Sequence, residues 1–348
     1  MKVGIVGLSG AGKYTIFSAL TAARGDARAP KDSSAEQLRG TVKVADERVD
    51  FLTKVFEPRK TTYAQVEYVL PTTRTSGAKQ DKENIMWSQV RPCDALIHVV
   101  RNFQGPGGLA PTHEEDFWKL EEEMILGDLL VVEKRIERIQ LDSRKGRRGN
   151  EREYALLKDC RRVLEANKPI RAVEDLASAP ELRGFTFLTA KPELVIINNE
   201  DDNPDPPTWA SPPDGLEILV VRGRLEMDIS SMTPEEAEEF FREYALEETA
   251  LDRVIRASYK LLNLISFFTV LNQEVRAWTI TRGTTALDAA GTVHSDMKKG
   301  FIRAEVLPFE KLKQFGSFQA ARKAGQVRLE GKEYQVQDGD IINFRFNI

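Results

Sequence analysis

Short runs of apolar residues recur along the chain and predict buried β-strands. Nearly every position in these runs is apolar, as is typical of parallel strands covered on both faces. The runs occupy residues 2–6, 66–70, 94–100, 194–197 and 216–221. A glycine-rich turn follows the first run, and the pattern of residues 14–23 predicts a helix. The chain therefore begins with a strand, a turn and a helix.

A longer period appears between the third and fourth runs. Apolar residues there alternate in spacings of four and three, which predicts the seam of a coiled coil. The seam consists of Ile125, Leu129, Val132, Ile136 and Ile139, followed by Leu156, Cys160 and Val163. Because glycines punctuate residues 142–150 between these two segments, we expect an antiparallel pair of helices joined by a turn.

The C-terminal part of the chain has a different texture. Residues 233–236 have the spacing of a capping box, and residues 251–262 predict an amphipathic helix. From Glu274 onward, short strands and turns predict a separate small α+β domain. An Asp-Gly pair at 338–339 precedes alternating apolar residues, so we expect a hairpin with one buried face. The alternating residues are Ile342, Phe344, Phe346 and Ile348.

Composition narrows the class of protein. The chain has 348 residues, enough for two or three domains, and its net charge of -4 gives no general attraction to nucleic acid. Two cysteines cannot form a disulfide framework, and three histidines are spaced too widely to predict a metal site. No run approaches the roughly 18 apolar residues of a membrane span. We therefore expect a soluble cytoplasmic protein without a membrane partner.

The turn after the first strand carries the strongest chemical signal. Residues 7–15, GLSGAGKYT, match the pattern GxxxxGK[ST] except at Tyr14, which replaces the serine or threonine that binds Mg²⁺. Backbone amides and the lysine of such a loop hold phosphates at a helix N-terminus. The candidate nucleotide-binding residues here are Ser9, Gly10, Ala11, Gly12, Lys13, Tyr14 and Thr15.

The turn between the two predicted coiled-coil helices is strongly basic. In a chain that is acidic overall, this cluster favours contact with the phosphate backbone of RNA, although a solvated turn has the same composition. We call these residues the basic tip. They are Arg144, Lys145, Arg147, Arg148 and Arg152. We expect no readout of DNA sequence.

Three further stretches are similar to a known family. They are LDRVIRASYKLLNL at 251–264, EVRAWTI at 274–280 and HSDMKKGFIRA at 294–304. Nearly the whole chain resembles the YchF / Obg-like ATPase family of translation-factor-related P-loop NTPases. The resemblance implies an α/β fold: a Ras-like P-loop NTPase domain with an inserted antiparallel coiled-coil hairpin and a C-terminal ubiquitin-like (β-grasp) TGS domain. The corresponding boundaries are 1–113 and 186–275, then 114–185, then 276–348.

The resemblance also implies ligands and partners. Family members bind ATP or GTP, so we expect one of these or its diphosphate, and a ribosome or ribosomal RNA as partner. At the strand end that reads the base, Asn198 and Asp201 have the N-x-x-D spacing that pairs a carboxylate with guanine. With a one-residue gap, Glu200 takes the family's glutamate position, which goes with ATP. The sequence leaves both alignments open.

The resemblance is poor at the catalytic positions. The family has Asp-x-Ala-Gly after its second strand, whose aspartate holds the metal through water and whose glycine amide meets the γ-phosphate. Leu70 and Thr73 stand there in this chain. With Tyr14, the usual Mg²⁺ ligands are thus missing, so we predict weak or lost hydrolysis and assign no catalytic or metal residues. The alternatives are an active ATPase or GTPase with substitute ligands such as Thr15, and a nucleotide-free ribosome-binding scaffold whose tyrosine ring fills the phosphate site.

Overall fold

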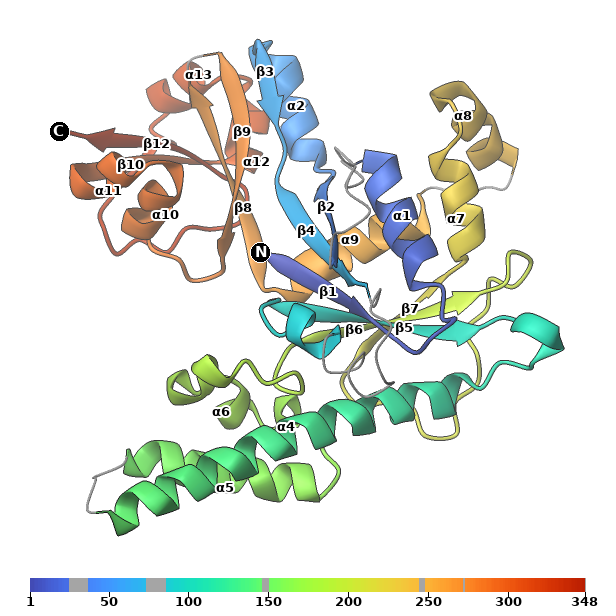
Figure 1. The fold of residues 1–348 in the computed structure, drawn as a ribbon. Coiled ribbons are helices and arrows are strands. Elements are labelled where there is room, and N and C mark those ends of the chain that lie inside the picture. The colour runs from blue at the N-terminus through green and yellow to red at the C-terminus, as the bar shows by residue number, and fades with distance from the viewer. Residues whose placement is uncertain (25–36, 73–85, 146–149, 244–247, 272, 348) are drawn as a thin grey trace. The chain divides into compact units, whose positions relative to one another are not determined.

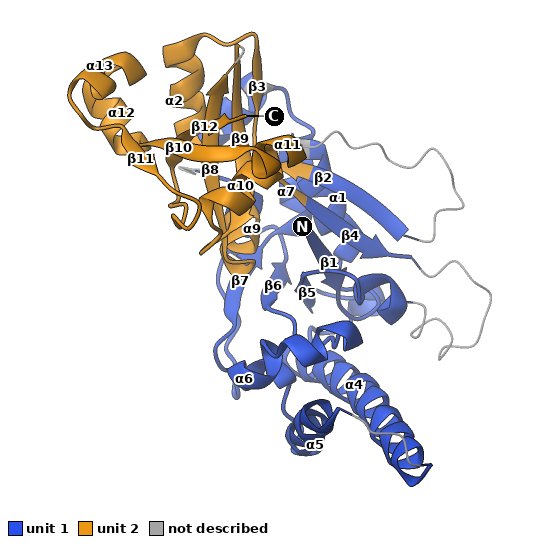
Figure 2. Ribbon diagram, turned by 90° about the vertical axis from the view of Figure 1, so that its left-hand side faces the viewer, with its two compact units in different colours: residues 1–41, 67–254 blue, residues 42–66, 255–348 orange. Residues whose placement is uncertain are grey.

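The computed structural model describes residues 1–24, 37–72, 86–145, 150–243, 248–271 and 273–347. The chain divides into two compact units, shown in Figure 2. The first comprises residues 1–41 and 67–254, and the second comprises residues 42–66 and 255–348. The three-part division expected from the sequence stays a prediction, and the structure adds that residues 42–66 fold with the C-terminal residues.

The first unit is built on a sheet of six strands in the order β2-β4-β1-β5-β6-β7. β1 is parallel to β4 and β5, and β6 is parallel to β5 and β7. β6 is buried along its whole length, as its apolar run predicts. The strands are β1 (Lys2–Val6), β2 (Gln37–Lys43), β4 (Gln65–Pro71), β5 (Ala95–Asn102), β6 (Glu193–Asn199) and β7 (Glu217–Val221).

Helices of the first unit include the predicted helical hairpin, in which α4 lies alongside α5 (Figure 1). The seam of α5 is shifted from our expectation, because Leu157 and Leu164 are buried while Leu156 and Val163 are only partly buried. The helices are α1 (Lys13–Arg24), η1 (Pro106–Gly108), α4 (His113–Arg144), α5 (Glu151–Glu165), η2 (Ile170–Ala172), α6 (Glu174–Ala177), η3 (Pro180–Phe185), α7 (Gly223–Ser230) and α8 (Pro234–Glu243). α9 (Ala250–Leu261) passes from the first unit into the second.

The second unit contains the C-terminal sheet, in the order β11-β10-β12-β8-β9-β3. β12 lies between β10, to which it is antiparallel, and β8, to which it is parallel. This is the ubiquitin-like arrangement expected of the TGS domain, with β3 added at the edge beside β9. The elements are α2 (Glu47–Phe56), β3 (Lys60–Thr62), β8 (Leu264–Leu271), β9 (Glu274–Thr281), α10 (Ala286–Val293), α11 (Ser295–Lys299), β10 (Phe301–Pro308), α12 (Phe309–Phe315), α13 (Phe318–Lys323), β11 (Arg328–Glu330) and β12 (Asp340–Phe346).

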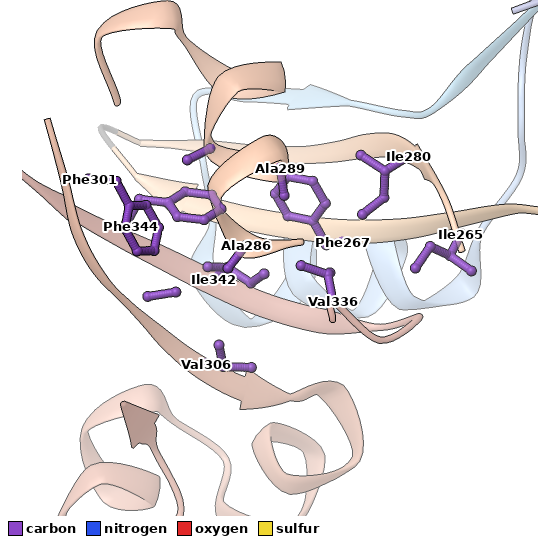
Figure 3. Packing of buried hydrophobic residues seen from close by; sticks show 12 residues of the cluster. Ile265, Phe267, Ile280, Ala286, Ala289, Phe301, Val306, Val336, Ile342 and Phe344 are labelled. Atoms are coloured by element: carbon purple, nitrogen blue, oxygen red, sulfur yellow. The ribbon is translucent and has the colours of Figure 1, made fainter. Parts of the chain in front are cut away.

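The core of the second unit lies between this sheet and α10 (Figure 3). Ala286 and Ala289 of α10 are buried among Phe267 of β8 and Phe344 of β12, because small side chains let the helix approach the sheet closely. The turn at 338–339 forms, but the local hairpin expected across it is wrong. β12 pairs instead with β10 and β8, and Phe346 is partly exposed.

Candidate nucleotide-binding site

The phosphate loop connects β1 to α1 through a turn that only glycine accommodates. Gly7 has a φ of +150° and a Cβ there would lie 2.3 Å from the carbonyl oxygen of Val99. Gly10 and Gly12 have φ values of +80° and +87°. A Cβ on Gly10 would meet no heavy atom within 4 Å. The glycines therefore allow the chain to turn sharply from β1 into the N-terminus of α1, an end of a helix where backbone amides favour an anion.

Lys13 lies over its own loop. Its Nζ donates to the carbonyl oxygens of Gly7 and Leu8, at 2.8 and 2.7 Å. These bonds use two of the three donors of an ammonium group and fix its position. Burial lowers the pKa of Lys13 to about 8, so at neutral pH the side chain still carries the positive charge that a phosphate requires.

Asn198, at the end of β6, joins the phosphate loop to the start of α7. Its Nδ2 donates to the carbonyl oxygen of Ala11 at 3.0 Å, and its Oδ1 accepts from the backbone N–H of Gly223 at 3.0 Å. A Cβ on Gly12 would lie 2.1 Å from Asn198 Nδ2, and one on Gly223 2.8 Å from Oδ1. Sequence reasoning missed Gly223, although a glycine two residues after the end of β7 was a usable signal.

Two acidic residues follow Asn198 at the end of β6. Glu200 Oε1 accepts from the backbone N–H of Gln104 at 2.7 Å. Asp201 Oδ1 accepts from the backbone N–H of Leu225 at 3.1 Å, in the first turn of α7. Both carboxylates are thus held by backbone amides, one from the segment after β5 and one from α7.

Tyr14 and Leu70 stand at the two positions from which the family resemblance implies that magnesium is held. Tyr14 lies in the first turn of α1, and 65% of the residue's surface is exposed. Leu70 near the end of β4 is 4% exposed and offers no oxygen ligand. Thr73 lies outside the described residues.

The described part of the basic tip lies at the end of the helical hairpin. Arg144 and Lys145 are exposed where α4 ends. Arg152 in α5 forms an ion pair with Glu181, with 2.8 Å between Nε and Oε1, so its charge is partly offset. Arg147 and Arg148 lie outside the described residues. Among the described residues of the basic tip, Arg152 is the one held in an ion pair, so Arg144 and Lys145 are the better candidates for contact with a phosphate.

No helix within the described ranges combines the length and the apolar character needed to cross a bilayer.

Comparisons with known proteins cover the whole chain. It is 36% identical over 367 residues to "Ribosome-binding ATPase YchF" of Bacillus subtilis (strain 168), covering 100% of both chains. It is 38% identical over 363 residues to the protein of that name from Escherichia coli O157:H7, covering 100% of this chain and 99% of the other. A family model for the C-terminal part of YchF GTPases, described as "Protein of unknown function (DUF933)", matches residues 264–347.

A solved structure gives the same result. The Schizosaccharomyces pombe YchF GTPase is similar with a TM-score of 0.85 and 28% identity, covering 99% of this chain and 97% of the other. The match extends through both sheets and the helical hairpin. With its phosphate loop, inserted hairpin and C-terminal ubiquitin-like sheet, this chain belongs to the YchF family.

Proposed function

We propose that this protein binds a purine nucleoside di- or triphosphate and acts as a nucleotide-dependent module on the ribosome, with little or no hydrolysis. The observation that carries the proposal is the tie made by Asn198, which joins the phosphate loop to the start of α7. A loop held in this way keeps its amides directed for phosphate even where side chains have changed. We propose that the candidate residues named from the sequence form this nucleotide-binding site.

Weak hydrolysis follows from the poor fit for magnesium. Phosphoryl transfer depends on positioning and on neutralising charge between the β- and γ-phosphates, which the metal ordinarily supplies. An exposed tyrosine at 14 and a buried leucine at 70 supply neither. Thr15 remains the substitute ligand to test for an active enzyme. The alternative of a loop filled by the tyrosine ring is not favoured, because most of that ring is exposed.

The ribosome is proposed as partner on two grounds. Curated relatives are named for ribosome binding, and exposed cations stand at the end of the helical hairpin. Such a projecting cationic end suits contact with RNA phosphates. Since ribosomes are cytoplasmic, the protein is proposed to work in the cytoplasm.

Thermal unfolding in the presence of nucleotides tests the proposal. ADP, GDP and their triphosphates at about 100 times the dissociation constant should stabilise the protein by roughly 2.7 kcal/mol. The shift should be the same with Mg²⁺ and with EDTA, because the metal's side-chain ligands are missing. Lys13→Ala should abolish it. A shift that requires Mg²⁺ would favour the active enzyme, and no shift with any nucleotide would favour the scaffold.

Nucleotide affinity should also depend on the protonation of Lys13. Since its pKa is about 8 without ligand, raising the pH from 7 to 9 should weaken binding, approaching about tenfold per pH unit above the pKa. Titration with a fluorescent nucleotide at pH 7, 8 and 9 measures this. Lys13→Arg, which stays charged, is the control and should bind with little pH dependence. Equal affinity of the parent at all three values would contradict the assignment of Lys13.

A further inference from the structure

Four ionisable side chains meet in the interior of the first unit, away from the phosphate loop. His98 comes from β5, Glu193 from β6, Glu121 from α4 and Arg171 from η2. His98 Nδ1 and Glu193 Oε1 are 2.9 Å apart. Arg171 Nη2 hydrogen-bonds Glu121 Oε2 and lies 2.5 Å from Glu193 Oε2. Sequence reasoning missed this cluster, because its members are far apart along the chain.

Each of the two carboxyl groups in this cluster has one buried oxygen that accepts no hydrogen bond. Glu121 Oε1, Glu193 Oε2 and Arg171 Nη1 are buried and have no hydrogen-bond partner among the described residues, and Glu193 Oε2 has only its ion pair with Arg171 Nη2. Two carboxylates can only accept, whereas one protonated carboxyl becomes a donor to the other. One proton would therefore supply a donor between two buried carboxyl groups that have oxygen atoms within 4.8 Å of each other. We propose that Glu121 and Glu193 share one buried proton, and that this proton fastens α4 to the sheet at the root of the helical hairpin.

The charges around the pair agree with one shared proton. Burial and the neighbouring Glu193 raise the pKa of Glu121 to about 7. Burial alone would raise the pKa of Glu193, but Arg171 and His98 outweigh it and lower that pKa. Glu121 is therefore the group that holds the proton. The negative charge of Asp128, also on α4, helps to raise the pKa of Arg171. Asp128 itself forms an ion pair with Arg91, with 3.0 Å between Oδ1 and Nη1.

A metal ion is the competing occupant of this cluster. Ligand atoms of His98, Glu121 and Glu193 lie within 4.8 Å of one another, which is close enough for a shared ion. The guanidinium of Arg171 already brings a positive charge to both carboxyl groups. A divalent cation would have to displace it or lie beside it, against charge repulsion. The geometry therefore favours a proton.

Glu121 is placed where α4 changes its partners. Phe117 and Leu120 before it are buried in the clusters that cover β5 and β6. Val132 and Ile136 beyond it pack in the helical hairpin with α5. Loss of the shared proton would leave an excess negative charge in the interior at this junction, at a cost in stability. Opening of α4 should therefore become easier as the pH rises.

The direction in which stability changes with pH follows from the raised pKa of Glu121. A folded form that holds the proton more tightly than the unfolded form loses stability as the pH rises from the ordinary value of 4.5 to about 7. Between pH 6 and 8 the equilibrium constant for opening α4 should rise about tenfold in the parent. Glu121→Gln keeps the shape, can donate to Glu193 and carries no charge, so its opening should not change with pH.

Hydrogen exchange and infrared spectroscopy together test the proposal on the full chain. Amide exchange of residues 117–125 should show the tenfold change in the parent and in Glu122→Gln, an exposed neighbour on the same helix, but not in Glu121→Gln. The infrared spectrum of the parent at pH 6 should contain a carboxylic acid band that is absent from Glu121→Gln. In Glu193→Gln the band should persist only to lower pH, because the neighbouring charge is gone.

Three results would overturn the proposal. One is the absence of a protonated carboxyl in the parent at pH 6 relative to Glu121→Gln. Another is a Glu193→Gln variant that titrates like the parent. The third is stoichiometric binding of Mn²⁺ or Zn²⁺ that Glu121→Gln abolishes, which would show that the cluster holds a metal ion instead.

Discussion

Replacing Tyr14 with serine is expected to leave hydrolysis of ATP and GTP close to the parental rate. The triple variant Tyr14→Ser, Leu70→Asp, Thr73→Gly is expected to exceed the single variant by about 10²- to 10³-fold in single-turnover hydrolysis, the usual effect of one well-placed electrostatic contact. The reason is that the single change supplies one metal ligand while the second anchor and the γ-phosphate amide are still absent.

The side chain of Tyr14 cannot act as a serine would. A phenol hydroxyl lies several ångströms farther from its backbone than a serine hydroxyl, and this ring is largely exposed. Serine at this position therefore adds a ligand without removing a buried obstruction. Nucleotide affinity is expected to change little on Tyr14→Ser alone, which direct titration with ADP and GDP can measure alongside the rate.

Leu70→Asp is the demanding step, because the position is almost fully buried. A carboxylate there loses hydration, so the triple variant should be less stable than the parent without ligand. Mg²⁺ and nucleotide together should restore part of that stability, which gives a readout apart from turnover. The same triple variant with Leu70→Asn is the matched control. Asparagine has nearly the same shape as aspartate but no charge. This control variant should therefore not hydrolyse nucleotide, and Mg²⁺ should not change its stability.

Two outcomes would contradict this account. Turnover by the parent at the rate of a curated relative assayed in parallel would mean that the enzyme is active with other ligands. Full recovery by Tyr14→Ser alone would mean that Leu70 and Thr73 are not the second motif, and that the alignment of β4 with the family is displaced.

Patterns confined to a few neighbouring residues were sufficient to predict many elements. The capping box at the start of α8 forms as its spacing predicts, with the backbone N–H of Thr233 donating to Glu236 Oε2 at 2.8 Å and that of Glu236 to Thr233 Oγ1 at 3.3 Å. The phosphate loop and the coiled-coil period are equally local. In each case the residues that fix the conformation lie within one or two turns of one another.

Long-range pairing was beyond the reach of the sequence. β3 joins β9 through pairs such as Thr62 with Arg276, and Thr62 donates to Glu274 Oε1 at 2.9 Å. Nothing in the sequence KTT of β3 indicates a partner more than two hundred residues away. The prediction of a hairpin at the end of the chain failed for the same reason. Alternating apolar residues specify which face of β12 is buried, but they do not specify which strands lie beside it in the sheet.

In the candidate site, too, features of one continuous motif were predictable, whereas contacts between distant segments were not. The place of Lys13 in its loop follows from one continuous motif, and its role in binding nucleotide stays a prediction. The role of Asn198 depends on two contacts, with Ala11 and with Gly223, that the fold alone brings together. Sequence spacing suggested that Asn198 reads a base, whereas the structure adds that it secures the loop. The acidic residues that follow it could be named but not oriented.

Reversing the charge of the basic tip is expected to weaken binding to ribosomes steeply. Arg144→Glu with Lys145→Glu should lower affinity by about 25- to 60-fold at 0.1 M salt if each residue contacts one phosphate, since each contact contributes roughly 0.7–0.9 log units per log unit of salt. Cosedimentation with ribosomes over a salt series measures both the affinity and its slope. Reversal of Arg147 and Arg148 as well should increase the loss.

The salt slope separates a phosphate contact from a change in folding. Both residues stand at the C-terminal end of α4, where glutamate also opposes the helix dipole at a cost of about 0.3–1 kcal/mol. Arg144→Gln with Lys145→Gln avoids much of that cost and should still lower the slope by about 0.7–0.9 per contact. Lys311→Glu with Lys313→Glu, an equal charge change on exposed residues of α12, is the matched control. If tip and control variants bind with the parental slope, the basic tip is a solvated turn; if both lose affinity equally, the attraction is one of overall charge and the hairpin has no special part in it.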